Sequence, residues 1–325
     1  MSRGTIQILN PGALTTIQDA GRFGYADMGI LQAGAMDTVS MQAANLLLDN
    51  APDEAVLECT LLGPEIRFDV PCAFAIAGAD MQPLLDGQKI PMHAMILAKA
   101  GSVLKLTAAA DGLRTCIAVK GGMDIEPVMG SRSTDMRCGI GGLEGRKMAA
   151  GDSIGLRAPE TILPDAYKRY LTAREVQRYL GHLRNGSEVK TLRVLWGPQA
   201  HLFTEKARGV FAENEYTLSA DSDRMGCRFT GTPIPAENGT DIVSDGIVCG
   251  AVQITSKGLP IVMTADHQTT GGYAKIAAVI TADLPVLAQL KPGEKIRFMP
   301  VSVKEAEKAA AGQRRRMKKL ARAVN

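Results

Sequence analysis

The sequence predicts a mainly β protein in which two β-barrel domains are related by internal duplication, with few short helices. Three observations support this class. Short apolar runs alternate with turns that contain glycine or proline along most of the chain. Glycine is frequent, at 34 of 325 residues, whereas aromatic residues make up 4%, so tight turns and aliphatic strands are expected. Several short motifs also recur in the same order in both halves.

The first half is expected to consist mostly of strands. An alternating strand over 5–9 ends at Pro11 and Gly12, and the polar stretch from Thr15 to Tyr25 is unlike a regular element. An apolar stripe predicts a helix over 38–48, with Asp37 as its N-cap. Turn residues then separate predicted strands at 55–61, 65–68, 72–77, 89–96, 102–106 and 114–119.

The second half repeats this strand-rich pattern after a charged, helical connection over 159–187, in which a helix is expected at 174–183. Strands are predicted at 191–196, 215–219, 241–243, 248–255 and 259–264, with a last strand ending at Phe298. A short helix is expected near 203–208. Another is expected near 284–290, with Asp283 as its cap and Pro285 in its first turn.

The recurring motifs define the predicted domains. The segment beginning at Arg22 (Arg-Phe-Gly-Tyr) matches the one beginning at Arg224 (Arg-Met-Gly-Cys), and Gly121-Gly122-Met123 matches Gly271-Gly272-Tyr273. We therefore predict a first barrel over 1–158, the helical connection over 159–187, a second barrel over 188–300 and a basic tail over 301–325.

Charge and composition limit the classes of partner. Residues 304–325 carry eight basic and two acidic side chains, so the formal charge of +3 leaves the body acidic and nucleic-acid binding is not expected there. The tail itself is helix-prone and poorly amphipathic, which favours a solvated helix over contact with RNA or an acidic partner. No run approaches the roughly 18–20 apolar residues of a membrane span, and no signal core is present, so a cytoplasmic protein without membrane contact is expected.

Metal binding is not predicted. The six cysteines and four histidines are widely scattered and include no Cys-x-x-Cys pair, so buried, reduced thiols are expected. Phosphate-loop, dinucleotide-binding and nucleophile-elbow motifs are also missing, as is a biotin-attachment segment.

A polar loop between two apolar runs is the strongest candidate site. It follows the run that ends at Met263 and precedes the run that begins at Ile276. The loop collects an acid, an imidazole, amides, hydroxyls, paired glycines, a phenol and an amine. Such dense donors, beside glycines that permit positive φ and close backbone approach, suit an anionic or carbonyl-bearing small molecule. A polar turn on a solvated edge is the alternative.

Longer motifs link the chain to a known family. They are LTTIQDAGRFGY, GAMD, GSRSTDMRCGIGGLEGR, AAGD, SDRMGCR, GAVQI, QTTGGY and KPGEKIRF, spread from Leu14 to Phe298. Together they resemble the carboxyltransferase A/B-domain family, also called allophanate hydrolase subunit 2. The resemblance implies a pair of cyclophilin-like β-barrels, which agrees with the duplication predicted above.

The resemblance also implies a subunit of a larger enzyme, inactive or weakly active alone. The nearest activity in the family is 5-oxoprolinase, which opens 5-oxo-L-proline to L-glutamate with ATP and needs a B-type and an A-type partner protein. ATP would contact the partner or a shared interface, without covalent biotin or metal in this chain. The alternatives are one half of a biotin-dependent carboxyltransferase acting on urea or a related amide, and a regulatory partner of a B-type protein.

For this chemistry the resemblance singles out two groups of residues. Activation of an amide develops negative charge, which arginine and amide donors stabilise, and a carboxylate can orient them or move a proton. The candidate catalytic residues are Asp19, Arg22, Arg224 and Asp266. The candidate substrate-binding residues are Tyr25, Arg132, Gln253, Thr269, Thr270, Gly271, Gly272, Tyr273 and Lys275. For each arginine, a bidentate pair that locks two loops is the alternative. His267 departs from the family pattern, where arginine is expected, so its role is left open.

Overall fold

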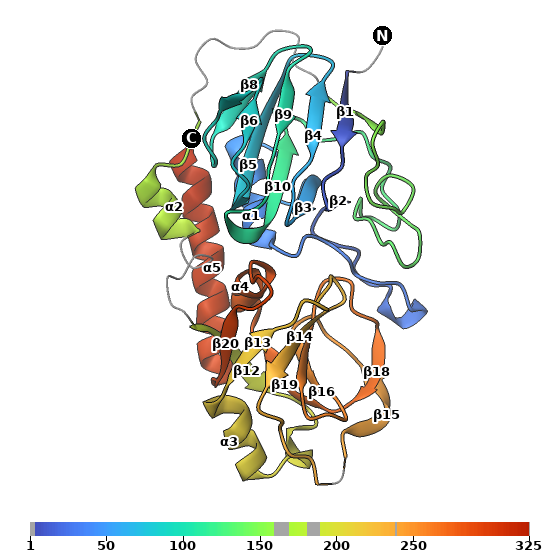
Figure 1. Cartoon of the computed structure of the whole chain (residues 1–325), viewed down its shortest axis with the longest axis vertical. Coiled ribbons are helices and arrows are strands. Elements are labelled where there is room, and N and C mark those ends of the chain that lie inside the picture. The colour runs from blue at the N-terminus through green and yellow to red at the C-terminus, as the bar shows by residue number, and fades with distance from the viewer. Residues whose placement is uncertain (1–3, 159–168, 181–188, 238, 325) are drawn as a thin grey trace. The chain divides into compact units, whose positions relative to one another are not determined.

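The structure is a computed structural model that describes residues 4–158, 169–180, 189–237 and 239–324 (Figure 1). Contacts divide the chain into two compact units. The first unit contains residues 1–22, 33–184 and 316–325, and the second contains 23–32 and 185–315. The predicted connection over 159–187 lies mostly outside the described residues, although its predicted helix is present as α2 (Ala173–Tyr179).

The first unit contains two antiparallel sheets. The strands are β1 (Thr5–Asn10), β2 (Leu14–Gln18), β3 (Val56–Thr60), β4 (Glu65–Phe68), β5 (Cys72–Asp80), β6 (Leu84–Leu85), β7 (Gln88–Lys89), β8 (Met95–Ala98), β9 (Val103–Lys105), β10 (Asp111–Val119) and β11 (Ser153–Gly155). One sheet has the order β11-β1-β4-β9-β6-β7 and the other has the order β2-β3-β10-β5-β8. Apolar residues of both sheets form one core, in which Phe68 and Phe74 stack with ring centroids 5.0 Å apart.

Strand β5 shows why this unit holds a second layer. Its residues are buried on both faces, so it lacks the apolar–polar alternation of a half-exposed strand. Phe74 and Ile76 face the core between the sheets, whereas Ala73 and Ala75 pack with α1 (Thr38–Leu47). The small alanine side chains let the helix approach the sheet closely. Asp37 caps α1 as predicted, accepting from the backbone N–H groups of residues 39 and 40 at 3.1 and 3.0 Å.

The second unit is a closed seven-stranded barrel, which confirms a barrel for this half. Its strands are β12 (Val189–Trp196), β13 (Glu215–Leu218), β14 (Gly226–Gly231), β16 (Ala251–Ile254), β17 (Pro260–Met263), β19 (Lys275–Val279) and β20 (Lys295–Pro300), in the order β12-β19-β16-β17-β14-β13-β20. Parallel pairing of β12 with β20 closes it. β15 (Asp241–Gly246) and β18 (Thr270–Tyr273) form a separate two-stranded sheet. Helices α3 (Glu205–Glu213) and α4 (Leu284–Ala288) belong to this unit, and Phe211 of α3 stacks on Phe298, with ring centroids 4.5 Å apart.

Three strand and cap predictions were wrong. The stretch from Thr15 to Tyr25 begins as the regular strand β2, whose polar residues are buried. The predicted strand over 89–96 is interrupted between β7 and β8, because His93 has a left-handed φ of 58° and Pro91 lacks an N–H to donate. Asp283 precedes α4 without capping it, because its carboxylate pairs with Arg193 at 2.6 Å instead.

The predicted solvated tail was also wrong in part. Residues 303–324 form the helix α5 (Val303–Val324), which is longer than the short helices expected. Its last turns are not free in solvent, since Leu320 and Val324 are buried with residues of α1 in the first unit. The arginine- and lysine-rich composition hid these two apolar positions, which lie four residues apart and so share one helix face.

Candidate functional site

Asp19 lies directly after β2, and four donors hold its carboxylate. The hydroxyls of Ser131 and Ser133 donate to Oδ1 at 2.7 and 2.6 Å. The backbone N–H of Gly21 donates to the same oxygen at 2.8 Å, and that of Arg132 donates to Oδ2 at 2.6 Å. Asp19 is 7% exposed. These contacts tie the turn after β2 to residues 131–133.

Arg22 is 2% exposed and is held by carbonyl groups rather than by a carboxylate. Its Nε donates to the backbone oxygen of Val128 and its Nη2 to that of Ser133, both at 3.0 Å. Its Nη1 is buried and has no hydrogen-bond partner within the part of the chain that the structure describes. A buried cation without a counter-charge is costly, so this guanidinium has unused capacity for an anionic or carbonyl oxygen.

The segment that contains Ser133 also holds a second buried polar atom without a partner. Oδ1 of Asp135 accepts from the backbone N–H groups of Arg137 and Cys138, both at 3.0 Å. Oδ2 of Asp135 is buried and has no partner among the described residues. Sequence reasoning noticed this polar segment but did not single out Asp135, Ser131 or Ser133. The signal was the concentration of hydroxyl and charged side chains in Gly-Ser-Arg-Ser-Thr-Asp.

Arg132 and Tyr25 both make hydrogen bonds that involve backbone groups. Besides the bond from its N–H to Asp19, Arg132 donates from Nε to the carbonyl of Ile125 at 2.9 Å. Tyr25 is half-buried, and its carbonyl accepts from the backbone N–H groups of Met28 and Ile30 at 3.1 and 3.2 Å. Neither contact assigns a substrate role to these two residues.

Arg224 and Asp266 form a buried bidentate ion pair in the second unit. Nε of Arg224 donates to Oδ2 of Asp266 at 2.8 Å and Nη2 donates to Oδ1 at 2.9 Å. The side chains are 3% and 12% exposed. The hydroxyl of Thr264 and the N–H of Asp266 both donate to the Arg224 carbonyl, at 2.7 and 2.8 Å. This arrangement is the loop-locking pair that the sequence offered as the alternative to catalysis.

Cys249 lies within electrostatic reach of this pair. Burial raises the pKa of its thiol to about 11, Arg224 lowers it and Asp266 raises it. The thiol is therefore protonated at neutral pH and is a poor nucleophile. His267, which was left open above, is 7% exposed, and its Nδ1 lies 2.7 Å from the carbonyl of Gln268.

Lys275 is also buried and paired. Its Nζ donates to Oδ2 of Asp245 at 2.7 Å, and the amide of Gln199 donates to the same oxygen at 3.3 Å. The hydrogen bond from Lys275 is the largest cause that holds the pKa of Asp245 below its usual value. Sequence reasoning missed Asp245 and Gln199, because they lie 30 and 76 residues from Lys275.

The glycines of the candidate loop lie in β18, not in a turn, and neither has a positive φ. What Gly271 provides is space: a Cβ there would lie 3.0 Å from Nε2 of Gln253 and 2.6 Å from Ile247. Gln253 is 3% exposed and donates to the Tyr273 carbonyl at 3.5 Å. Thr270 is exposed, and Thr269 uses its carbonyl to accept from Ile247. Gly272 is less crowded, with the Ile242 carbonyl 3.4 Å from such a Cβ.

The predicted residues are divided between the two units. Asp19, Arg22 and Arg132 belong to the first unit, whereas Arg224 and Asp266, with the loop residues around Lys275, belong to the second. Among the described residues, no group of three or more histidine, cysteine, aspartate or glutamate side chains is arranged to bind a metal. No helix in the described ranges is both long and apolar enough to cross a membrane.

Comparison with known proteins identifies the family. The model of the carboxyltransferase domain, subdomains A and B, matches residues 28–300. The chain belongs to this family.

The comparison also identifies individual proteins to which this chain is similar. The chain is 36% identical to the 5-oxoprolinase C subunit of Escherichia coli over 97% of each chain. It is also 36% identical to the 5-oxoprolinase C subunit of Haemophilus influenzae, over 93% of each. Among solved structures, the urea carboxylase of Kluyveromyces lactis has a TM-score of 0.89 and 26% identity over 98% of this chain. The chain spans only 29% of that carboxylase, so it is similar to one part of a longer protein.

Proposed function

We propose that this protein is the C subunit of a 5-oxoprolinase, which opens 5-oxo-L-proline to L-glutamate with ATP. The observation that carries the proposal is its similarity to two proteins named as 5-oxoprolinase C subunits over nearly their whole length. A name that specifies one subunit implies partners. We propose a B-type and an A-type protein as those partners, with little or no activity from this chain alone.

Arg22 is the proposed contact for the reacting group. When a lactam is activated, negative charge develops on its oxygen, and a donor placed there lowers the barrier. Arg22 keeps one N–H-bearing nitrogen without an acceptor, whereas Arg224 already binds both oxygens of Asp266. We therefore assign the first arginine to the ligand and the second to the stability of the barrel loops.

ATP fits this chain poorly. A triphosphate needs several free donors, often in a glycine-rich loop that precedes a lysine. In the described residues, Lys275 is engaged by Asp245 and Arg224 by Asp266, and Arg22 offers one free nitrogen. We propose that a partner protein supplies the ATP site.

A second candidate is one half of a biotin-dependent carboxyltransferase that acts on urea or a related amide. The similarity to the K. lactis urea carboxylase favours it. This chain has no biotin-attachment segment in its sequence, so a carrier on another polypeptide would be needed.

The evolutionary proposal is that both halves derive from one duplicated barrel, with domains at 1–158 and 188–300. The parallel sequence motifs support it, as does the closed barrel of the second unit. In the first unit the corresponding strands are divided between two sheets. A superposition of the two units in an experimental structure, with the motif glycines falling at equivalent strand positions, would test it.

Reconstitution tests the proposed activity. Glutamate release from 5-oxoproline is measured with ATP for this chain alone, for each pair and for the three-protein mixture. We expect release only in the complete mixture and only with ATP. A mixture that assembles, as seen by size-exclusion chromatography, but releases no glutamate would overturn the assignment. Carboxyl transfer from carboxybiotin to urea in the same preparation would then support the second candidate.

A further inference from the structure

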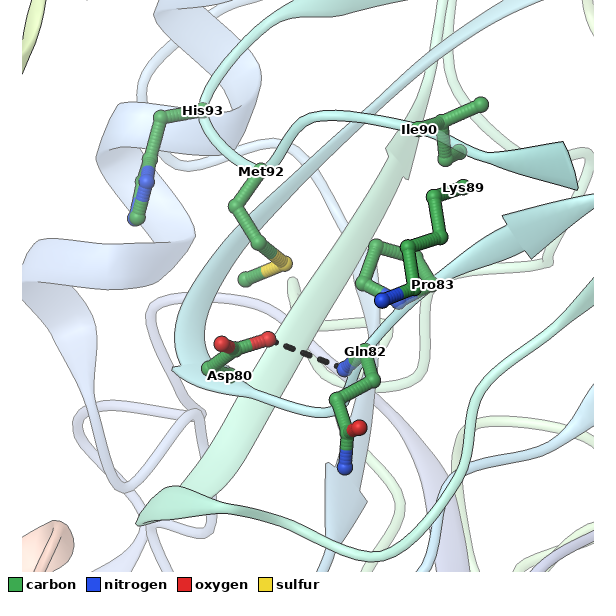
Figure 2. A pocket seen from close by; sticks show the side chains of 7 residues that line it. All are labelled: Asp80, Gln82, Pro83, Lys89, Ile90, Met92 and His93. Carbon is green, nitrogen blue, oxygen red and sulfur yellow. Dashed lines mark hydrogen bonds between the residues drawn. The ribbon is translucent and has the colours of Figure 1, made fainter.

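A cavity in the first unit contains none of the residues that the sequence predicted for the site. Its volume is about 340 Å³. It is lined by Asp80, Gln82, Pro83, Lys89, Ile90, Met92 and His93 (Figure 2). These residues come from the end of β5, from β7 and from the loops that follow both strands. The volume is near the lower end of the range for small-molecule sites, about 300–1,000 Å³, so the fitting ligand is small.

The backbone around this cavity adopts unusual conformations. Gln82, Asp86 and His93 have φ values of 48°, 51° and 58°, in the left-handed region that non-glycine residues rarely enter. Side-chain contacts hold two of them in place. The Asp80 carboxylate accepts from the N–H of Gln82 at 2.9 Å, and that of Asp86 accepts from the N–H of Val103 at 2.7 Å. Strained positions of this kind concentrate at ligand clamps.

Two opposite charges face the cavity without pairing with each other. Figure 2 shows the end of the Lys89 side chain beside Pro83 and the Asp80 carboxylate near Met92, with one carboxylate oxygen bonded to Gln82. Oδ1 of the carboxylate accepts from Gln82, and Oδ2 has no hydrogen-bond partner among the residues that the structure describes. In the described chain, no ion pair within 4.0 Å joins Lys89 to any acid. The opposite charges thus leave room for a molecule between them.

We propose that this cavity binds a small amino or cyclic imino acid. The carboxylate of the ligand pairs with Nζ of Lys89, its N–H donates to the free oxygen of Asp80, and its carbon skeleton packs on Met92 and Pro83. Both charged contacts are charge-assisted hydrogen bonds, which are the stronger kind. The cavity lining includes neither Arg22 nor Arg224, and the proposal concerns binding alone. Only the choice of probes below rests on the proposed function.

Isothermal titration of the full chain with L-glutamate, and separately with 5-oxo-L-proline, tests the site. We expect at least one probe to bind at millimolar concentration or tighter. Lys89→Met and Asp80→Asn should each weaken binding about tenfold or more, because each removes a charge-assisted contact. Binding of glutamate alone indicates an amino-acid site, and binding of 5-oxoproline alone indicates a lactam site.

Matched controls separate the cavity from general charge effects. Lys147→Met and Asp53→Asn change exposed residues of the same unit outside the cavity, and should alter affinity less than twofold. Asparagine at position 80 still offers an oxygen to the Gln82 N–H, and Lys89 is exposed, so both test variants should fold. Met92→Trp, which fills the cavity, should also abolish binding.

Two results would overturn the proposal: no heat of binding from either probe, or affinities that the three cavity variants leave unchanged. The readout does not depend on turnover. If the reconstituted enzyme is inactive while binding persists, the proposed function fails and the cavity site stands. If the enzyme is active but the chain binds neither probe, the cavity site fails alone.

Discussion

Arg22 and Arg224 begin matching motifs in the two halves of the chain, yet their surroundings differ. Both are almost fully buried, at 2% and 4% exposure. Arg224 meets a carboxylate that accepts from two of its nitrogens. Arg22 meets two backbone carbonyls and leaves Nη1 without a partner in the described chain. The neighbouring acid, Asp19, is occupied by hydroxyl and backbone donors instead.

The difference shows that arginines which begin similar motifs can have different hydrogen-bond partners. A buried arginine with a bidentate acid stabilises the position of two segments, but removal of one partner leaves an uncompensated charge. A buried arginine with only carbonyl partners keeps its charge available to an incoming anion.

Arg224→Met should lower the free energy of unfolding by about 3–5 kcal/mol, because Asp266 is left buried and unpaired. Urea denaturation followed by circular dichroism measures it. Arg228→Met, an exposed residue on β14, is the control and should change stability by no more than about 0.5 kcal/mol. If Arg224→Met lowers the free energy of unfolding as little as the control does, the ion pair does not stabilise the two loops.

Ser133→Ala should destabilise the first unit by about 1–3 kcal/mol, because the N–H of Asp19 loses its acceptor and the carboxylate loses a donor. Ser153→Ala, on β11 and exposed, serves as the matched control. Equal melting temperatures for both variants would show that the Asp19 contacts do not hold this loop.

Arg22→Met should change stability by only about 1 kcal/mol, less than either variant above. The substitution loses two hydrogen bonds to carbonyls, but it also removes a buried charge that has no counter-ion. Arg137→Met, an exposed change in the same unit, provides the baseline. If Arg22→Met lowers the free energy of unfolding in urea as much as Arg224→Met does, Arg22 has the same structural role as Arg224. The contrast between the two arginines would then not hold.

The Lys275–Asp245 pair should give an effect that is visible as a pH dependence. The folded pKa of Asp245 is lowered, so its stabilising contribution is full above the unfolded value near 3.9 and is lost as the pH falls through the folded value. The difference in urea midpoint between wild type and Asp245→Asn should therefore be present at pH 7 and shrink toward pH 3. A difference that grows on acidification would reverse this sign.

Local patterns predicted much of the fold. The cap at Asp37 and the strand at residues 65–68 depend on neighbours within a few positions, and both are present. The predictions failed where a partner far away in the sequence determines the structure. Asp283 looked like a helix cap but pairs with Arg193, 90 residues away. Strand β2 was missed because three of its four buried residues are polar, and Gln18 is satisfied by the Thr134 carbonyl, which lies 116 residues further along.

The candidate site was predictable as a set of residues but not as a set of partners. The motifs identified Arg22, Arg224 and Asp266, and they offered the bidentate pair as an alternative. They did not indicate that Asp19 would be held by two serines, because hydroxyl partners have no fixed spacing. The cavity near Lys89 was missed for another reason. It depends on residues with a left-handed backbone conformation, such as Gln82, and the residue type of Gln82 does not predict that conformation.

The most direct test compares the two arginines in the reconstituted complex, as glutamate released per assembled, folded enzyme. We predict that Arg22→Met assembles normally and loses activity about 100-fold or more, as expected when a donor to developing charge is removed. For Arg224→Met, activity should fall only in proportion to the folded protein that is lost. Full activity with Arg22→Met, or inactivity of a well-folded Arg224→Met enzyme, would contradict the division of roles between them.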